Sequence, residues 1–335
     1  MVADLVSMIT PCYGTASYLP KLLRSIIKQT YPQIELFVID DGSPDDIQGV
    51  VKEFEPEFRK KGYRIEYIRQ FNSGQSVAIQ NGLDKINGEY LVWPDSDDFY
   101  ASENSISKMV DRFKLSGQDV GMVRTQEIIV RDNAENTPIQ TLGKNAKEEE
   151  SRSLFEDCLL QKNGFYFCSG AYMIKSEALM SSTRLPIYTE KDAGQNWQLL
   201  LPVLYNYRCS TILEPLYNVV ERITSHSRVN KSYERSCQRI ETYKRTLLGT
   251  LQNIRNISAD DLHKYTEMVE ANNQYIHLIN ALIYNKKAES IRLFQQLNEQ
   301  GHQIDKRTMI KYILLRIGML DTIHKSKKII SHILN

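Results

Sequence analysis

Two clusters of carboxylic acids stand out, because each directly follows a short apolar run. Asp40-Asp41-Gly42-Ser43 follows Leu36–Ile39, and Asp95-Ser96-Asp97-Asp98 follows Leu91-Val92-Trp93-Pro94. Asp, Ser and Pro are also favoured at helix starts, so helix capping explains the first cluster about as well as a binding role does. Capping explains the second cluster less well, because crowded carboxylates repel and raise one another's pKa unless a cation is present. Its spacing therefore favours a Mg²⁺ or Mn²⁺ site of the kind shared with substrate phosphates.

The elements that must position these clusters alternate between strand and helix patterns over the first 125 residues. Strands are predicted at Leu5–Thr10, Leu36–Ile39, Arg64–Arg69 and Tyr90–Trp93, and helices from Ser17, from Ser43-Pro44 and over Val77–Ile86. Strands separated by helices of this length indicate an α/β fold with a mainly parallel sheet and right-handed crossovers. In such a sheet the ligand crevice lies beyond the carboxyl ends of the strands, which is where both acidic clusters fall.

Composition and charge limit the classes of function. The chain has 335 residues, of which 41% are hydrophobic and 25% charged, with a formal net charge of +1. These values are typical of a globular protein of about two structural units, and they do not support a nucleic-acid partner. The five cysteines are scattered without a CxxC pair, which argues against a disulfide framework and a Cys-based zinc site. The N-terminal residues lack a signal-peptide pattern, and no apolar run approaches the roughly 18 residues of a membrane span, so a cytoplasmic protein is expected.

Several segments, taken in order, resemble the family 2 glycosyltransferases. They are Val6–Tyr13, Ser25–Tyr31, Asp40–Ser43, Asn72–Ser76, Gly88–Tyr90 and Asp95–Asp98. The resemblance covers about Leu5 to Asn230 and implies a GT-A fold over residues 1–230. Residues 1–125 would form a Rossmann-like nucleotide-sugar half, and residues 126–230 an acceptor half. The implied activity is a metal-dependent, inverting glycosyl transfer of hexosyltransferase type, with UDP as the expected nucleotide of the donor.

The resemblance also implies roles for individual residues. Pro11 and Tyr13 match the loop that lines the base pocket, and Asp41 matches the acid that hydrogen-bonds the nucleobase. Asp95 matches the first acid of the DxD motif, near the ribose and the metal, and Asp97 matches the acid that meets Mn²⁺ or Mg²⁺. The full set implied for the nucleotide sugar is Pro11, Tyr13, Asp40, Asp41, Ser76, Asp95, Ser96, Gly170 and His226.

Two members of this set have simple alternatives. Gly170 follows Cys168-Ser169, at the start of a predicted strand, and borders the donor sugar in the family, but it also fits an ordinary strand glycine. His226 lies in a polar segment that closes over the diphosphate in some members, and it equally fits a surface histidine.

The chain departs from the family at the general base. Many members carry Gly-Glu-Asp-Trp at the start of a helix under the acceptor site, and this chain has Gly194-Gln195-Asn196-Trp197. An amide cannot accept the acceptor's proton as a carboxylate does. Asp192 is the first candidate for the missing base, on one face with Asn196 if the helix reaches back that far, and Glu190 is the second. Ordinary acids in the first turn of a helix remain the alternative.

From about Lys231 onward the patterns predict a helical C-terminal region, residues 231–335, which the resemblance does not reach. Residues 302–335 contain seven Lys or Arg against two Asp. A basic amphipathic helix of this kind can rest on an anionic membrane surface, here the inner face of the membrane. Packing against the catalytic domain or against a second copy, as a homo-oligomer, is the alternative.

Two rival functions follow from other classes of protein. A nicotinamide dehydrogenase needs G-x-G-x-x-G after the first strand, and Pro11-Cys12-Tyr13-Gly14 stands there instead, which excludes it. A glycosyltransferase-like protein that binds nucleotide sugar without turnover remains the alternative, because of Asn196. Bacterial relatives imply a glycan or lipid-linked acceptor, as in capsular or other surface polysaccharide synthesis.

Overall fold

The computed structural model describes residues 1–132, 134–143, 149–150, 153–222 and 232–318. The chain divides into two compact units. The first comprises Met1–Ser227 and Thr246–Leu262, and the second comprises Arg228–Arg245 and His263–Asn335. Two helices, α8 (Tyr233–Asn253) and α9 (Ala259–Ile283), each contribute residues to both units. The predicted boundary between a domain of residues 1–230 and a helical region of residues 231–335 stays a prediction.

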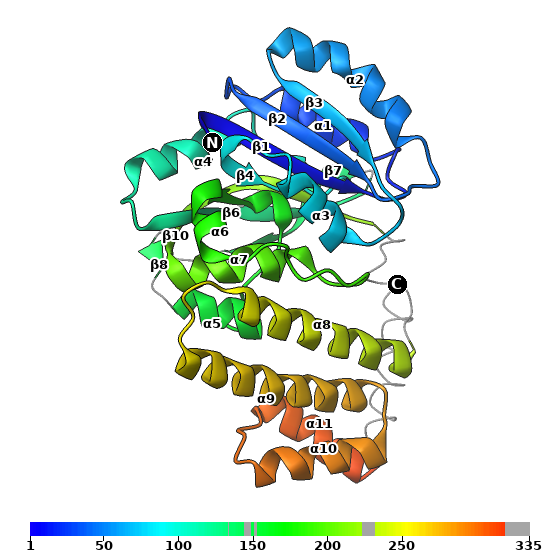
Figure 1. Ribbon diagram of the computed structural model, residues 1–335. Helices are drawn as coiled ribbons and strands as arrows, with labels where there is room; N and C mark the ends of the chain where they lie inside the picture. Colours follow the sequence, from blue (N-terminus) through cyan, green and yellow to red (C-terminus); the bar gives the residue numbers. More distant parts are fainter. Residues whose placement is uncertain (133, 144–148, 151–152, 223–231, 319–335) are drawn as a thin grey trace. The chain divides into compact units, whose positions relative to one another are not determined.

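A ten-stranded sheet forms the centre of the first unit (Figure 1). Its order is β3-β2-β1-β4-β9-β6-β10-β5, and β7 and β8 pair with β6 and β10 respectively. The strands are β1 (Val2–Cys12), β2 (Ile34–Asp40), β3 (Arg64–Arg69), β4 (Gly88–Val92), β5 (Phe99–Tyr100), β6 (Val120–Arg131), β7 (Ala134–Leu142), β8 (Glu149–Glu150), β9 (Tyr172–Lys175) and β10 (Arg208–Glu221). The first four strands are mutually parallel, which confirms the predicted parallel sheet. Strand β9 runs antiparallel to both β4 and β6 and joins the two halves of the sheet.

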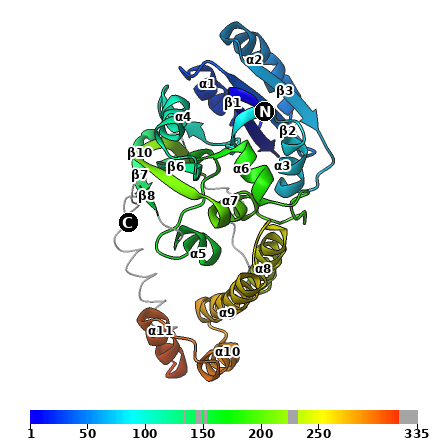
Figure 2. The same ribbon diagram turned by 60° about the vertical axis from the view of Figure 1, so that its left-hand side comes forward.

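Helices cover both faces of this sheet (Figure 2). They are α1 (Leu19–Ile27), α2 (Ile47–Lys61), α3 (Gln75–Leu83), α4 (Ser105–Leu115), α5 (Ser153–Leu160), α6 (Ser176–Ser182) and α7 (Gln195–Asn206). Helices α1 and α2 pack together on one face, whereas α3 and α6 pack with α7 on the other. The chain steps outward from β1 to β3 and then returns to place β4 on the opposite side of β1. This reversal makes a switch point between β1 and β4, where sheets of this class bind ligands.

Local side-chain chemistry moves some predicted boundaries. The predicted helix at Ser43-Pro44 begins later, at Ile47, because the Asp46 carboxylate accepts the backbone N–H of Gly49 at 2.8 Å and caps the helix there. The predicted strand at Cys168–Lys175 opens instead with a 3₁₀ turn, Ser169–Ala171, and only its second half is strand β9. Strand β3 has the predicted bounds Arg64–Arg69.

The second unit is helical and has its own apolar core. It contains the first part of α8, most of α9, and the helices α10 (Lys287–Glu299) and α11 (Lys306–Arg316). Its buried core residues are Leu278, Ala281, Leu282, Leu293, Leu297, Tyr312 and Leu315. The rings of Phe294 and Tyr312 stack with centroids 3.8 Å apart and join α10 to α11. The predicted C-terminal helices are therefore present. Within the described ranges, no helix combines the length and the apolar character needed to cross a membrane.

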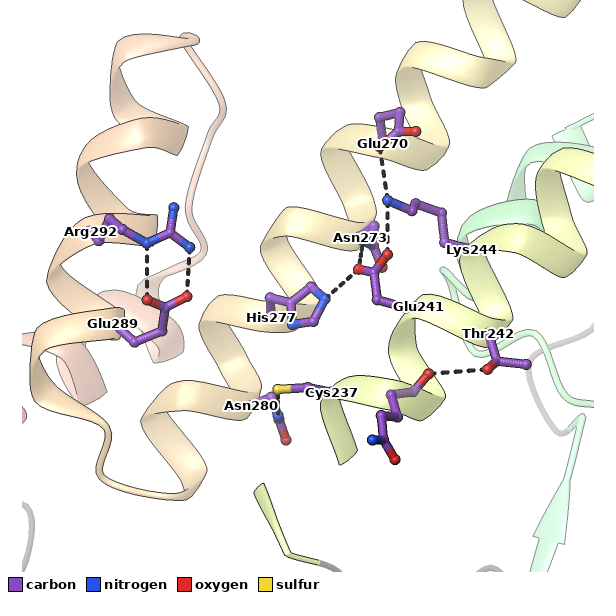
Figure 3. A network of polar contacts seen from close by, with 11 residues as sticks. Cys237, Glu241, Thr242, Lys244, Glu270, Asn273, His277, Asn280, Glu289 and Arg292 are labelled. Carbon is purple, nitrogen blue, oxygen red and sulfur yellow. Dashed lines mark hydrogen bonds and ion pairs between the residues drawn. The ribbon is translucent and has the colours of Figure 1, made fainter. Parts of the chain in front are cut away.

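A polar network ties α8 to α9 inside this unit (Figure 3). The Glu241 carboxylate accepts a hydrogen bond from Asn273 Nδ2 at 2.8 Å and contacts His277 Nε2 at 2.7 Å and Lys244 Nζ at 3.0 Å. Partial burial alone would raise the pKa of Glu241, but the hydrogen bonds from Asn273, His277 and Lys244 outweigh it and lower the pKa to about 2. The ionised carboxylate is therefore stabilised in the folded chain.

We expect Glu241→Gln to lower the melting temperature of the protein near neutral pH. A carboxylate whose folded pKa lies below its unfolded value adds stability above the unfolded pKa and loses it as the pH falls. The difference from wild type should therefore shrink as the pH falls from about 4.5 toward about 2. Because 39% of the Glu241 side chain is exposed, the effect should be about 1 kcal/mol or less, or roughly 2–4 °C. Circular dichroism melts at stepped pH measure it, with the exposed Glu299→Gln as control. A pH-independent difference would contradict the network's role.

Candidate active site

Three loops meet at the carboxyl ends of β1, β2 and β3. The backbone N–H of Gly14 donates to Ser43 Oγ at 2.9 Å, which joins the first loop to the second. The Asp41 carboxylate accepts the backbone N–H groups of Ser73 and Gly74 at 2.8 and 2.9 Å. It also accepts Gln70 Nε2 at 2.8 Å. The hydrogen bonds of Asp41 therefore connect the loop after β3 to the loop after β2. Its predicted hydrogen bond to a nucleobase stays a prediction.

Asp40 is a fully buried acid within the same cluster. Its carboxylate accepts the backbone N–H of Ser43 at 2.7 Å, and Tyr67 Oη and Arg69 Nη1 at 2.6 Å each. These bonds satisfy the buried charge and close the turn after β2. The predicted contact of Asp40 with the donor stays a prediction.

Two exposed aromatic side chains flank the loop cluster. Tyr13 follows β1 and is 48% exposed, whereas Phe71 follows β3 and is 94% exposed. An aromatic ring left in water beside a polar loop cluster offers a flat surface on which a nucleobase can stack. Pro11 lies within β1 and is buried. No role for Phe71 was predicted from the sequence, although an aromatic residue directly before Asn72-Ser73 was a usable signal.

The second acidic cluster forms a turn after β4, at the switch point. Each carboxylate has a different partner from later in the chain. Asp95 Oδ2 accepts Ser169 Oγ at 3.1 Å, Asp97 forms an ion pair with Arg222, and Asp98 Oδ1 accepts the backbone N–H of Val220 at 2.8 Å. The backbone N–H of Asp98 closes the turn onto the carbonyl of Asp95 at 3.2 Å. Residues from the second half of the sheet therefore hold the acids of the first half.

Crowding within this turn disfavours full ionisation. Burial, and then the negative charge of Asp97, raise the pKa of Asp95 to about 7, against the opposing effects of Ser169 and Arg222. Burial, followed by the charges of Asp97 and Asp95, raises the pKa of Asp98 well above its usual range. The turn therefore concentrates negative charge that its hydrogen bonds only partly offset.

The donor set of this turn fits a divalent cation that is shared with a substrate. Asp95 and Asp97 supply two hard oxygen ligands, and a cation between them would relieve the repulsion that raises the pKa of Asp95. Among the described residues, no group of three or more His, Cys, Asp or Glu side chains forms a closed metal site. The remaining ligands would have to come from phosphate oxygens or water, as is usual for Mg²⁺.

The smaller residues predicted at the donor have structural partners. Ser96 Oγ donates to Thr15 Oγ1 at 2.9 Å, and Ser76 Oγ donates to the carbonyl of Glu190 at 3.2 Å. Gly170 packs against the buried ring of Tyr217, and a Cβ added to Gly170 would lie 2.1 Å from that ring. The group that requires a glycine here is therefore the Tyr217 ring. Donor contacts of Ser76, Ser96 and Gly170 stay predictions. His226 lies outside the described residues.

Asn196, which occupies the position of the family's base, joins a chain of hydrogen bonds. Its Oδ1 accepts Trp93 Nε1 at 2.8 Å and Ser169 Oγ at 3.3 Å. Since Ser169 Oγ also contacts Asp95 Oδ2 at 3.1 Å, one hydroxyl links the amide to the acidic turn. Asn196 therefore positions its neighbours around the end of β4, and its amide has no basic group to offer.

The two candidate bases lie ahead of helix α7. The helix begins at Gln195 after Gly194, whose extended backbone (φ −73°, ψ 129°) prevents it from reaching back to Asp192. Asp192 and Asn196 therefore do not share a helical face, and Asp192 lies exposed in the preceding segment. The Glu190 carboxylate accepts Tyr188 Oη at 2.9 Å.

This segment packs directly on the loop after β3. A Cβ added to Gly74 would lie 2.0 Å from the carbonyl oxygen of Lys191, and Gly74 has a φ of +92°. Only glycine accommodates both the backbone conformation and the contact. The acids at 190 and 192 are therefore held beside the loop that Asp41 fastens.

Comparison with known proteins places the chain in a family. It matches the Glycosyl transferase family 2 model over residues 7–181 and belongs to this family. Glycosyltransferase GlyA of Streptococcus pneumoniae serotype 4 is 42% identical over 99 residues, which is 30% of this chain and 14% of that protein. The chain thus spans only a small part of this relative.

Two solved structures share the fold. The crystal structure of S. aureus TarS 1-349 in complex with UDP-GlcNAc superimposes with a TM-score of 0.60 at 15% identity, over 95% of this chain and 88% of that one. The mannosyltransferase PcManGT from Pyrobaculum calidifontis, in complex with GDP-Man and Mn²⁺, gives a TM-score of 0.50 at 16% identity, over 94% and 86% of the two chains. These likenesses support the GT-A architecture predicted from the sequence.

Proposed function

We propose that this protein is an inverting glycosyltransferase that moves a sugar from a nucleotide diphosphate donor, with UDP as the nucleotide, to an acceptor hydroxyl. The observation that carries the proposal is the pair Asp95 and Asp97 at the switch point, beside the loop cluster that Asp41 fastens. Membership of family 2 supports the reaction class. UDP-GlcNAc in TarS and GDP-Man with Mn²⁺ in PcManGT support the donor class and the use of Mn²⁺ or Mg²⁺.

The acidic turn would bind the cation and the diphosphate of the donor. Asp95 and Asp97 would hold Mn²⁺ or Mg²⁺, which when bound supplies positive charge to offset the departing diphosphate. Asp98 keeps the turn in place through Val220 and remains outside this set. Tyr13 and Phe71, whose rings are both exposed, would flank the nucleobase.

Inversion requires a base on the acceptor side. The acceptor oxygen forms its bond to the anomeric carbon as the bond to the diphosphate oxygen breaks, and the hydroxyl proton passes to a carboxylate. Asp192 is the first choice, because its exposed carboxylate lies in the segment that packs on the loop of Gly74. Glu190 is the second, and Asn196 would orient Ser169 and Trp93.

The alternative function is a protein that binds nucleotide sugar without turning it over. Asn196 at the position of the family's base favours it. The acids of the turn favour an enzyme, because buried carboxylates that repel one another are costly to maintain without a cation to bind. Detection of a transfer product separates the two.

The acceptor in this proposal is a glycan or a lipid-linked intermediate of surface polysaccharide synthesis, reached at the inner face of the membrane. Helix α11 supplies a surface for such contact. Ile310, Ile313 and Ile317 are 57%, 49% and 60% exposed, and their spacing aligns them in one stripe. The exposed Arg307 and Lys311 lie beside this stripe, and no acid occurs within α11. An apolar stripe beside cationic side chains matches an anionic lipid surface. Residues 319–335 of the basic tail lie outside the described residues.

Binding of UDP should depend on the metal through Asp97. We expect UDP with Mn²⁺ to raise the melting temperature more than UDP alone, since a ligand at 100 times its Kd adds about 2.7 kcal/mol to the native state. Asp97→Ala should lose the metal-dependent part of this rise. The control is Asp119→Asn, which removes a surface ion pair with Arg208. An undiminished rise in Asp97→Ala would refute the metal role.

The base assignment predicts opposite effects at two positions. Asp192→Asn should slow UDP release from a UDP-sugar at least about tenfold, the low end of general-base effects, with UDP affinity near wild type. Asn196→Asp should leave turnover unchanged or raise it, because it restores a carboxylate. Asp157→Asn serves as a surface control. Equal turnover in Asp192→Asn and wild type would remove Asp192 as the base, and Glu190→Gln would then be measured in the same way.

The α11 stripe predicts selective binding to anionic vesicles. The double variant Ile313→Ser, Ile317→Ser should bind vesicles of phosphatidylglycerol and phosphatidylcholine at least about tenfold more weakly in sedimentation assays, because each buried isoleucine contributes about 1.5–3 kcal/mol. The control Leu115→Ser alters an 86% exposed apolar residue of the first unit. Equal binding of wild type to pure phosphatidylcholine, or a dimer that the double variant abolishes, would contradict the membrane assignment.

A further inference from the structure

Arg222 directly follows β10, and its guanidinium is paired with Asp97, one of the two proposed metal ligands. Its guanidinium forms an ion pair with Asp97 Oδ2, and the two side chains are only 17% and 19% exposed. The guanidinium carbon also lies 4.6 Å from the ring centre of Tyr18. Its Nε is buried and has no hydrogen-bond partner among the described residues. The sequence analysis assigned no role to this residue.

The ion pair and a metal compete for the same carboxylate. A divalent cation held by Asp97 would lie within a few ångströms of the guanidinium, and two cations at that distance repel strongly where water is scarce. Arg222 also offsets the negative charge of the acidic turn, because its guanidinium is paired with Asp97. The guanidinium of Arg222 therefore already supplies a positive charge at Asp97.

Leaving this position costs Arg222 few contacts. Because Nε makes no hydrogen bond, what holds the guanidinium among the described residues is the bond to Asp97 and the face of Tyr18. A diphosphate brings negative charge that can accommodate both a metal and a displaced guanidinium, and arginine binds phosphate oxygens well. Displacement of Arg222 from Asp97 is therefore unfavourable when the metal binds alone. It becomes favourable when the nucleotide binds together with the metal.

We propose that Arg222 occupies the cation position at Asp97 in the protein without donor and is displaced when a divalent metal binds. Arg222 therefore weakens metal binding to the free protein and couples metal binding to nucleotide binding. The inference rests on the metal-assisted reaction proposed above. It predicts that removal of the guanidinium strengthens metal binding most in the absence of UDP, which separates it from a residue that merely supports the fold.

The test measures Mn²⁺ binding by electron paramagnetic resonance, with and without UDP, and needs no turnover. In Arg222→Met, which keeps an unbranched side chain against Tyr18, Mn²⁺ should bind the free protein at least about fivefold more tightly than in wild type, the low end of typical coupling between sites. With saturating UDP the Mn²⁺ affinities of the two proteins should differ by less than about fivefold. The coupling between Mn²⁺ and UDP binding should therefore be weaker in Arg222→Met than in wild type. Arg222→Lys should stay close to wild type, because it keeps the charge. Arg64→Met, which breaks an exposed pair with Glu66, is the matched control.

One result would overturn the inference, and a different one would overturn the proposed function on which it rests. Equal or weaker Mn²⁺ binding in free Arg222→Met, in a protein whose circular dichroism matches wild type, would show that Arg222 does not compete. If Arg222→Met fails to fold, Arg222→Gln takes its place in the same assay. Absence of Mn²⁺ binding in wild type and variant alike, even with UDP, would instead refute the metal dependence of the proposed function.

Discussion

Repulsion among the carboxylates that follow β4 is the constraint on which the arrangement of the first unit depends. Each acid is compensated by a different later element: Asp98 by the backbone of β10, Asp97 by Arg222 beyond it, and Asp95 by the turn before β9. Two hydrogen bonds and an ion pair therefore link this turn to the second half of the sheet. The strand pairing of β9 with β4 and β6 makes the same connection through the backbone. The acidic turn is both the proposed site and a junction of the fold.

Asn196 fits this constraint. It lies one hydroxyl away from Asp95, and a carboxylate there would add negative charge to a turn in which burial and Asp97 already raise the pKa of Asp95 to about 7. The neutral amide instead accepts Trp93 Nε1 and Ser169 Oγ without adding charge. In the family, the residue at the position that the resemblance assigns to Asn196 supplies the base. In this chain the Asn196 side chain instead forms hydrogen bonds that link α7 to the end of β4. In the proposed mechanism the base is therefore a residue outside the helix.

Patterns in the sequence predicted those parts of the fold that depend on local order. The run Arg64–Arg69 has the bounds of β3, because its local pattern indicates where the strand lies. Both acidic clusters lie at carboxyl ends of parallel strands, because strands that alternate with helices form a parallel sheet. Contacts between residues far apart in the chain left no local signal. The pair of Arg222 with Asp97 depends on the register of β10, and the exposure of Phe71 depends on which loops surround it. A shared face of Asp192 and Asn196 required the helix to reach back to Asp192, but α7 begins only at Gln195, after the extended backbone of Gly194.

The loop after β3 connects the proposed donor pocket to the proposed base. Asp41 accepts the backbone N–H of Gly74, and the carbonyl of Lys191 packs where a side chain at residue 74 would lie. Ser76, in the first turn of α3, adds a hydrogen bond to the carbonyl of Glu190. A nucleotide bound beside Asp41 would therefore contact the loop that packs, through Gly74, against residues 190–192. Because Gly74 has no side chain, the loop after β3 contacts the backbone of Lys191 directly. The segment carrying the candidate bases is thus set by the same loop that receives the donor.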